Sequence, residues 1–215
     1  MTGTTPSLLI GGDFRRHTGE APIEVVNPST EEILWTAPAA GRDEIAEALH
    51  HARAALPAWS AVHGWERAKV LRGIARAMER RKAELVRALS LEIGRPIAQS
   101  EGEVLIAIEQ FDWFAGEAER LFGETIPSRQ GGRLSAVPEP VGIVAAFTAW
   151  NFPINLLARK IAPALAAGCP IICRPSEQTP LTSTLIADAC VEGGAPAGVL
   201  QMLHGPAEAV THALM

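Results

Sequence analysis

The hydrophobic positions between residues 42 and 122 recur at three- and four-residue spacing, which is typical of helices that bury one face. Start and stop signals divide this segment. Gly94 and Pro96 interrupt it, and acidic residues stand in the first turn of the first helix. The pattern therefore predicts three helices, over Arg42–Ala58, Trp65–Leu89 and Ile97–Phe122.

Shorter apolar runs bounded by turn residues lie on both sides of these helices. Near the start of the chain they predict two strands, Ser7–Ile10 and Ile23–Val26. Residues 123–140 are loop and short strand, with Gly131-Gly132 as a hairpin turn before a strand at Arg133–Val137.

From Val141 onward, apolar strands alternate with helical segments. This alternation predicts right-handed crossovers and a parallel sheet. Three strands make half of a doubly wound sheet, and we expect the last of them to expose an unpaired edge. The expected strands are Gly142–Ala149, Cys169–Arg174 and Val199–His204, and the helices are Ile154–Ala167, Pro180–Glu192 and an interrupted one over Pro206–Met215.

The predicted fold class is therefore α/β. An N-terminal arm of strands and helices precedes an incomplete doubly wound, Rossmann-like parallel sheet. We divide the chain into residues 1–122, a hairpin segment over residues 123–140, and the first part of a nucleotide-binding domain over residues 141–215.

Composition narrows the function classes. The net charge of −5 argues against a nucleic-acid partner. No apolar run approaches the about 20 residues that cross a membrane. Three cysteines without CxxC spacing indicate reduced thiols, so we expect a soluble, cytoplasmic protein. The histidines show no metal-ligand spacing, and no metal site is expected.

The turn after the first parallel strand carries candidate chemistry. Ligands of open α/β sheets bind at the carboxyl ends of strands, beside helix N-termini that favour anions. Asn151 in this turn offers an amide NH₂ that can donate to an oxyanion. Alternatively, Asn151 caps the following helix, with Pro153 in its first turn.

The sequence motifs around this turn resemble those of the aldehyde dehydrogenase superfamily. Trp150-Asn151-Phe152-Pro153 is followed by APALAAGC and RPSEQTP, and EPVG and NPST stand upstream. The resemblance covers essentially the whole chain. It implies NAD(P)-dependent oxidation of an aldehyde to the acid, through a nucleophilic cysteine and a general-base glutamate that would lie beyond residue 215. The chain is thus expected to be the N-terminal part of such an enzyme and to be inactive alone. Cys169, Cys173 and Cys190 are expected to be structural.

The resemblance also implies roles for individual residues. Asn151 matches the asparagine that helps to hold the oxyanion. Ala149 stands where proline is usual, and Arg174 stands where most members have lysine. The positions implied to contact the cofactor are Thr148, Ala149, Trp150, Asn151, Lys160, Arg174, Ser176 and Glu177.

The cofactor can be argued from two of these residues. The Glu177 carboxylate accepts hydrogen bonds from ribose hydroxyls and repels a 2′-phosphate, which favours NAD. The Arg174 guanidinium could pair with that phosphate and permit NADP. We expect NAD, with use of NADP left open.

The substrate is indicated by one longer segment. QFDWFAGEAERLFGETIPSR, which contains Trp113, resembles the succinate-semialdehyde branch of the family. In that branch, an arginine at the position of Arg159 holds the distal carboxylate of the substrate. The alternative is that Arg159 is a solvated helix residue.

Two alternatives to an enzyme are also consistent with the sequence. A short, non-catalytic chain could act as an interaction or regulatory subunit, pairing with full-length relatives through residues 123–140, or the chain could be a pseudogene product. The complete enzyme is expected to be a homo-oligomer that takes a small aldehyde.

Overall fold

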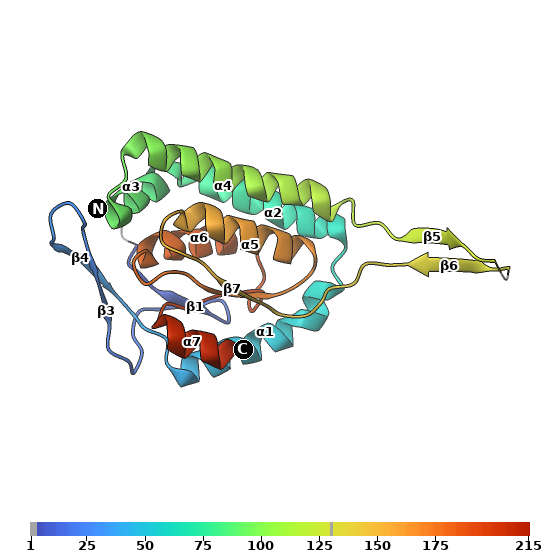
Figure 1. Cartoon of the computed structure of the whole chain (residues 1–215), viewed down its shortest axis with the longest axis horizontal. Helices are drawn as coiled ribbons and strands as arrows, with labels where there is room; N and C mark the ends of the chain where they lie inside the picture. Colours follow the sequence, from blue (N-terminus) through green and yellow to red (C-terminus); the bar gives the residue numbers. More distant parts are fainter. Residues whose placement is uncertain (1–3, 130) are drawn as a thin grey trace.

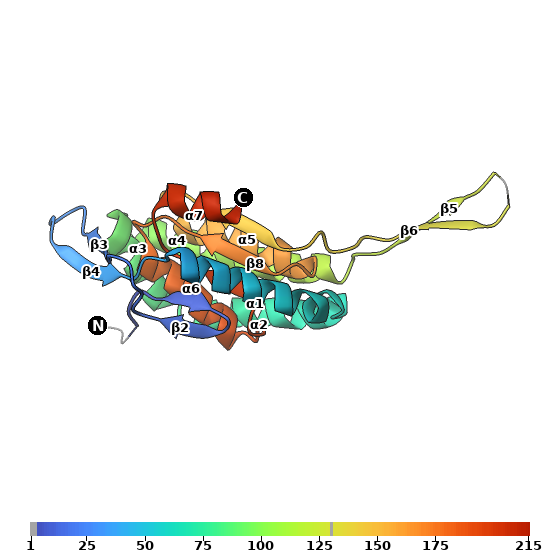
Figure 2. The same cartoon turned by 90° about the horizontal axis from the view of Figure 1, so that it is seen from below.

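Helices cover both faces of a central sheet in a layered arrangement (Figures 1 and 2). The computed structural model describes residues 4–129 and 131–215. One face is covered by α5 (Pro153–Ala166) and α6 (Pro180–Glu192), and these are covered in turn by α2 (Gly64–Arg80), α3 (Lys82–Ile93) and α4 (Ile97–Ala118). The other face is covered by α1 (Arg42–Ser60) and α7 (Ala207–Leu214).

The central sheet confirms the predicted fold class. Its strand order is β2-β1-β9-β8-β7, and β7, β8 and β9 run parallel with helices between them. The strands are β1 (Leu8–Ile10), β2 (Asp13–Arg15), β7 (Val144–Phe147), β8 (Ile171–Arg174) and β9 (Leu200–Met202).

The expectation of an unpaired edge on the last strand is wrong. β9 pairs with β1 in antiparallel orientation, and Leu9 lies opposite Met202. All three residues of β1 are buried, so the strand is apolar on both faces and suits the interior of a sheet. Within the described residues, the two edge strands of the sheet are instead β2 and β7.

The long helix expected over Trp65–Leu89 is two helices. α2 ends and α3 begins around Arg81, whose φ of −96° and ψ of 9° are not helical. The predicted apolar stripe is nonetheless buried on both sides of this break, because α2 and α3 both pack on α4 and α6. Hydrophobic periodicity does not reveal a break of a single residue.

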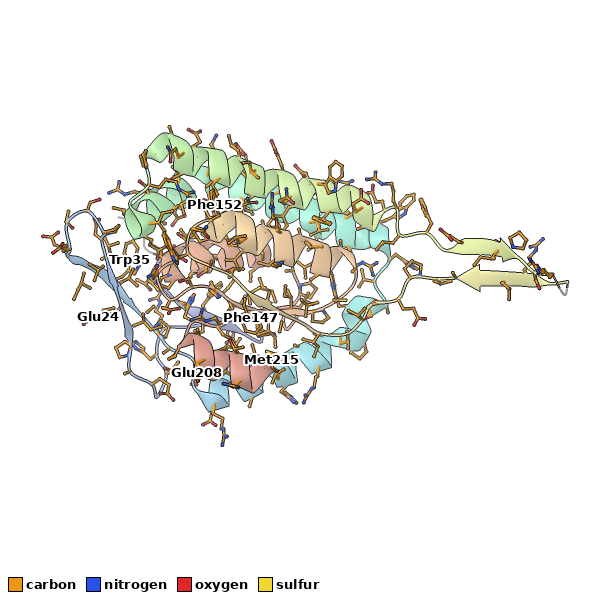
Figure 3. The ribbon with its side chains drawn as sticks, viewed as in Figure 1. Glu24, Trp35, Phe147, Phe152, Glu208 and Met215 are labelled. Carbon is orange, nitrogen blue, oxygen red and sulfur yellow. The ribbon has the colours of Figure 1, made fainter. Side chains whose placement is uncertain are left out.

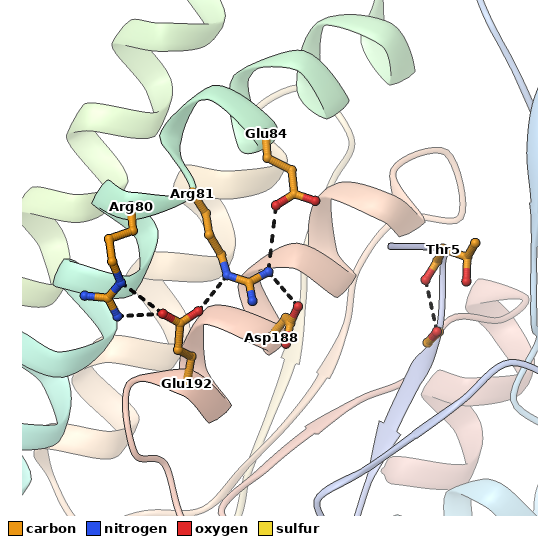
Figure 4. Close-up of polar contacts among 7 residues, drawn as sticks. Thr5, Arg80, Arg81, Glu84, Asp188 and Glu192 are labelled. Carbon is orange, nitrogen blue, oxygen red and sulfur yellow. Dashed lines mark hydrogen bonds and ion pairs between the residues drawn. The ribbon is translucent and has the colours of Figure 1, made fainter. Parts of the chain in front are cut away.

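The guanidinium groups at this corner bind the end of α6 (Figure 4). Arg81 donates to Asp188 over 2.6 Å and to Glu192 over 2.7 Å, and Arg80 also pairs with Glu192. These ion pairs join the α2–α3 corner to the layer beneath.

Two other helix predictions differ in detail. α1 continues past Pro57 to Ser60, because a proline in the last turn removes only one hydrogen bond. α7 is a continuous helix, although the sequence predicted an interruption.

Two hairpins extend from the body. β3 (Ile23–Val26) pairs with β4 (Ile33–Ala37) as expected for the first of these strands. β5 (Glu124–Pro127) pairs with β6 (Arg133–Ala136), and this hairpin projects away from the layers (Figure 1). It confirms the hairpin predicted at Gly131-Gly132, both of which have positive φ, while Gln130 lies outside the described residues. The proposed domain boundaries remain predictions.

Candidate functional site

The carboxyl ends of the three parallel strands meet at one edge of the sheet. Phe147 at the end of β7 lies opposite Arg174 at the end of β8. The Thr148 backbone N–H donates to the Arg174 carbonyl over 3.2 Å, and the Leu203 N–H donates to Cys173 over 2.9 Å. The turns that follow the strands, residues 148–152, 175–179 and 203–206, therefore lie at one edge, which is where open α/β sheets bind ligands.

The first turn presents three polar or aromatic side chains. Trp150 is half exposed, and Asn151 is exposed. Within the described residues, no hydrogen bond holds the Asn151 side-chain amide, so it is free to donate to a ligand. The Thr148 hydroxyl is buried and without a hydrogen-bond partner among the described groups. An orphaned buried hydroxyl costs free energy unless a ligand or water satisfies it.

The backbone of this turn is held from the helical layer. The Asn151 carbonyl accepts a hydrogen bond from Arg95, whose guanidinium carbon lies 4.5 Å from the centre of the Phe152 ring. Arg95 also pairs with Glu103 on α4. The buried Glu103 carboxylate accepts from the first free N–H groups of α5, at Ile154 over 2.9 Å and at Asn155 over 3.1 Å. Phe152, the N-cap residue of α5, lies at the start of that helix, beneath α4 (Figure 3).

The second turn carries a buried arginine and a half-exposed carboxylate. Arg174 donates from Nη2 to the Gly205 carbonyl over 2.8 Å and from Nε to the same oxygen over 3.2 Å. Its Nη2 also pairs with Glu177, whose side chain is 45% exposed. Ser176 is buried, and its hydroxyl accepts from the Gln178 N–H. Arg174 thus joins the second turn to the third.

The start of α6 is capped in the same way as that of α5. Glu92 on α3 accepts from the N–H groups of Leu181 over 2.8 Å and Thr182 over 2.9 Å, and from the Trp35 indole over 3.2 Å. Burial raises the pKa of Glu92 to about 7. Figure 3 shows Trp35 on the hairpin β3–β4, where it faces the body of the molecule.

The remaining predicted site residues lie on helices. Arg159 and Lys160 are exposed on α5, and neither makes an ion pair within the described residues. Trp113 is 65% exposed on α4, which packs beside α5. The structure therefore brings Thr148, Ala149, Trp150 and Asn151 beside Arg174, Ser176 and Glu177. Within the described residues, no hydrogen bond or ion pair joins Arg159, Lys160 or Trp113 to these turns.

The cysteines are core residues, as the sequence predicted. Cys169, Cys173 and Cys190 are all buried and unpaired. Burial raises the pKa of Cys173 and Cys190 far above the ordinary range of a thiol. Both therefore stay protonated at neutral pH and are poor nucleophiles. In the described part of the chain, no group of three histidine, cysteine or acidic residues could hold a metal ion.

Sequence reasoning missed the residues that support the turns: Arg95, Glu103 and Glu92. A signal was present for the two glutamates. Glu103 falls at helical spacing between Ser100 and Ala107, which are buried on the same face of α4. A carboxylate on a buried stripe requires a partner, and the two glutamates find theirs at helix ends.

The fold defines an α/β chain with parallel strands, and the first two strand-to-helix turns at this edge carry polar groups. Comparisons with known proteins identify the family to which the chain belongs. A family model described as Aldehyde dehydrogenase family matches residues 14–215. The chain belongs to the aldehyde dehydrogenase family.

Three relatives illustrate the similarity. The succinate-semialdehyde dehydrogenase [NADP(+)] GabD of Escherichia coli is 39% identical over 207 residues, which are 96% of this chain and 43% of that protein. The glutarate-semialdehyde dehydrogenase of Pseudomonas putida is 39% identical over 92% of this chain and 42% of its own length. The crystal structure of PnpE in complex with nicotinamide adenine dinucleotide matches with a TM-score of 0.94 at 34% identity, over 98% of this chain and 44% of that one.

These relatives bear on the earlier expectations in two ways. The aldehyde dehydrogenase resemblance and the likeness to semialdehyde dehydrogenases are confirmed. The chain spans less than half the length of the curated relatives that it matches. No helix within the described residues has the length and apolar character to cross a membrane.

Proposed function

We propose that this chain supplies the N-terminal, cofactor-binding part of a cytoplasmic NAD(P)-dependent dehydrogenase that oxidises the semialdehyde of a dicarboxylic acid. The observation that carries the proposal is the edge where the first two strand-to-helix turns meet, in a chain similar to semialdehyde dehydrogenases along nearly its whole length. The free amide of Asn151 and the orphaned Thr148 hydroxyl suit a ligand at that edge.

In the proposed reaction, Asn151 donates its side-chain N–H to the oxyanion that forms when a thiolate attacks the aldehyde. NAD(P)⁺, when bound, would accept the hydride from the substrate carbon, and water would then hydrolyse the resulting thioester to release the acid and the thiol. Trp150 and the backbone of Thr148 and Ala149 would hold the nicotinamide side of the cofactor, and Lys160 is a further position that the family resemblance assigns to it. The thiolate is not one of this chain's cysteines, since all three are buried. The 215-residue chain is therefore expected to show no turnover alone.

The residues of the second turn fit a ribose. The half-exposed Glu177 carboxylate can accept from ribose hydroxyls, and Ser176 lies beside it. Arg174 donates from Nε and Nη2 to the Gly205 carbonyl and from Nη2 to Glu177, so these two nitrogens are engaged within the chain rather than by a 2′-phosphate. This arrangement supports NAD as the preferred cofactor. NADP should be tested beside it, because the name of the similar E. coli enzyme gives NADP(+) as its cofactor.

The proposal is tested with a chimera in which residues 1–215 replace the matching part of the E. coli relative. We expect NAD-dependent oxidation of succinate semialdehyde, and a loss of kcat of at least about a hundredfold in Asn151→Ala, as for one oxyanion donor. Arg159→Met should raise KM for succinate semialdehyde and leave KM for an uncharged aldehyde unchanged. A chimera that is folded and binds NADH but oxidises no semialdehyde would contradict the proposal.

A second candidate is an interaction subunit, and one observation favours it. Both strands of the β5–β6 hairpin are exposed throughout, and they carry Ile126 and Leu134 at 44% and 55% exposure. Exposed apolar strand edges pair with other chains. We propose that this hairpin mediates assembly of the complete enzyme into a homo-oligomer. Light scattering on the chain and on Ile126→Glu/Leu134→Glu tests this, since a mass that is the same in both would count against the hairpin.

A further inference from the structure

Arg95 and Glu103 connect three parts of the chain that meet beside Asn151. Glu103 comes from α4, and its side chain is 1% exposed. One oxygen of its carboxylate accepts from Ile154 and Asn155, and the other pairs with Arg95. Arg95 lies between α3 and α4, is 14% exposed, and donates its second Nη to the Asn151 carbonyl. We propose that this Arg95–Glu103 pair is a positioning device that fixes the Asn151 turn for the reaction.

The start of α5 needs an acceptor from elsewhere in the chain. The first N–H groups of a helix have no partner within it, and an N-cap side chain ordinarily supplies one. The N-cap residue here is Phe152, which has no acceptor in its side chain. The Glu103 carboxylate takes that place. The position of the first turn of α5 is therefore set by α4.

Arg95 extends this restraint to the residue that carries the proposed chemistry. The Asn151 side chain makes no hydrogen bond within the described residues, so the place of its amide depends on where its backbone is held. That backbone is held by Arg95 at the Asn151 carbonyl, and the guanidinium also lies over the Phe152 ring. An asparagine donor must lie within hydrogen-bond reach of the oxyanion, and a shift of about 1 Å is costly in rate.

The charges give a second reason for pairing the two residues. A helix N-terminus carries a partial positive charge that favours an oxyanion, and an unpaired carboxylate on the same turn would oppose it. Arg95 neutralises Glu103, so the turn gains the cap without gaining a net negative charge. An arginine suits this role better than a lysine, because its two terminal nitrogens reach two acceptors at once.

This inference rests on the proposed function, and its test separates the two. The first readout needs no activity. In the 215-residue chain, hydrogen exchange of the segment 151–155 should become about tenfold faster in two variants: Arg95→Met, which loses the bond to the Asn151 carbonyl, and Glu103→Gln, which keeps an acceptor oxygen but loses the charge of the cap and the ion pair with Arg95. Arg95→Lys should fall between these and the wild type, because it keeps the charge but loses one contact.

Glu192→Gln is the matched control. It removes the two arginine–carboxylate ion pairs that Arg80 and Arg81 make with the end of α6, which do not involve the Asn151 turn. It should leave exchange in the segment 151–155 unchanged. If Arg95→Met and Glu103→Gln change this segment no more than Glu192→Gln does, the positioning role is refuted.

The second readout is kinetic and uses the chimera. Loss of position at Asn151 affects an interaction made in the transition state, so kcat should fall at least about tenfold while KM changes less than about twofold. Arg95→Lys should recover part of kcat. A kcat equal to wild type in Glu103→Gln, despite faster exchange, would overturn the proposal. A wild-type chimera without dehydrogenase activity would instead count against the proposed function, and exchange would then decide whether the pair holds the turn.

Discussion

At the scale of single residues, Glu92 is a buried carboxylate that makes no ion pair within residues 4–129 and 131–215. Its neighbours are the Trp35 indole and the N–H groups of Leu181 and Thr182, all of which donate hydrogen bonds. Desolvation outweighs these bonds and raises its pKa to about 7. Between its ordinary pKa, near 4.5, and this value, the folded chain holds a proton that the unfolded chain has lost.

This difference makes the stability of the chain depend on pH. Since the folded state binds the extra proton, the contribution of Glu92 to stability is complete below pH 4.5 and is lost as pH rises through about 7. The loss is about 3 kcal/mol by linkage. We predict that Glu92→Gln gains stability relative to wild type, by about this amount, between pH 4.5 and pH 7. Urea unfolding at several pH values measures it, and a difference that is constant with pH would contradict it.

His204 should have the opposite effect. It is fully buried and donates from Nε2 to the Ser7 carbonyl over 3.1 Å, which leaves Nδ1 without a partner among the described groups. Burial lowers its pKa from 6.5 to about 4. The unfolded chain therefore binds a proton first as pH falls, and the stability that neutral His204 permits above pH 6.5 is lost toward pH 4.

The prediction for His204→Gln follows from this loss of stability as pH falls. Glutamine keeps a donor for Ser7 but does not titrate, so the variant should gain about 3 kcal/mol relative to wild type as pH falls from 6.5 to 4. In the wild type, the slopes of His204 and Glu92 largely cancel where their ranges overlap. Measuring both variants in the same pH series tests whether the two slopes have opposite signs.

At the scale of elements, α2 and the end of α6 approach so closely that glycine is required at the contact. A Cβ on Gly73 would lie 2.2 Å from the Gly193 carbonyl oxygen. A methyl group in the middle of a helix ordinarily stabilises it by about 1 kcal/mol. Here the backbone of α6 would have to move, which costs about 1–3 kcal/mol. We predict that Gly73→Ala lowers the free energy of unfolding.

Gly102 provides the control for this prediction. It also lies inside a helix, α4, but a Cβ there would meet nothing within 4 Å. Gly102→Ala should therefore stabilise the chain by up to about 1 kcal/mol. If both substitutions stabilise the chain in urea unfolding, the packing of α2 on α6 is looser than the structure indicates.

The elements also show what the sequence can and cannot predict. Residues such as Leu71 and Phe111 lie on stripes with helical spacing, so the helices and their buried faces were predictable. The break at Arg81 was not, because the stripe continues across it. The turn with Asn151 was predictable from the sequence motif that surrounds it. The contact of Arg95 with that turn was not, because it joins residues 56 positions apart.

At the scale of the whole molecule, the unpaired edge expected on the last parallel strand was the main error. Strands β7, β8 and β9 follow one another in the chain and pair as crossover rules require. The pairing of Leu9 with Met202 joins the two ends of the chain, and nothing in the local pattern of either strand specifies its partner. An apolar strand such as β1 requires burial, but the sequence does not indicate with which strand of the sheet it pairs.

The exposed hairpin β5–β6 should be separable from the stability of the layers. Its strands are exposed throughout, and it projects from the end of the body (Figure 1). Because folding stability comes mainly from buried apolar surface, a chain with residues 124–136 replaced by a short glycine–serine linker should keep its unfolding midpoint within about 2 °C. Calorimetry of the two chains at the same concentration and at tenfold dilution makes the comparison. A midpoint that falls with the deletion at high concentration only would show that the hairpin stabilises an assembly, since dissociation lowers stability by mass action. A fall at both concentrations would mean that the hairpin packs on its own body, contrary to the structure.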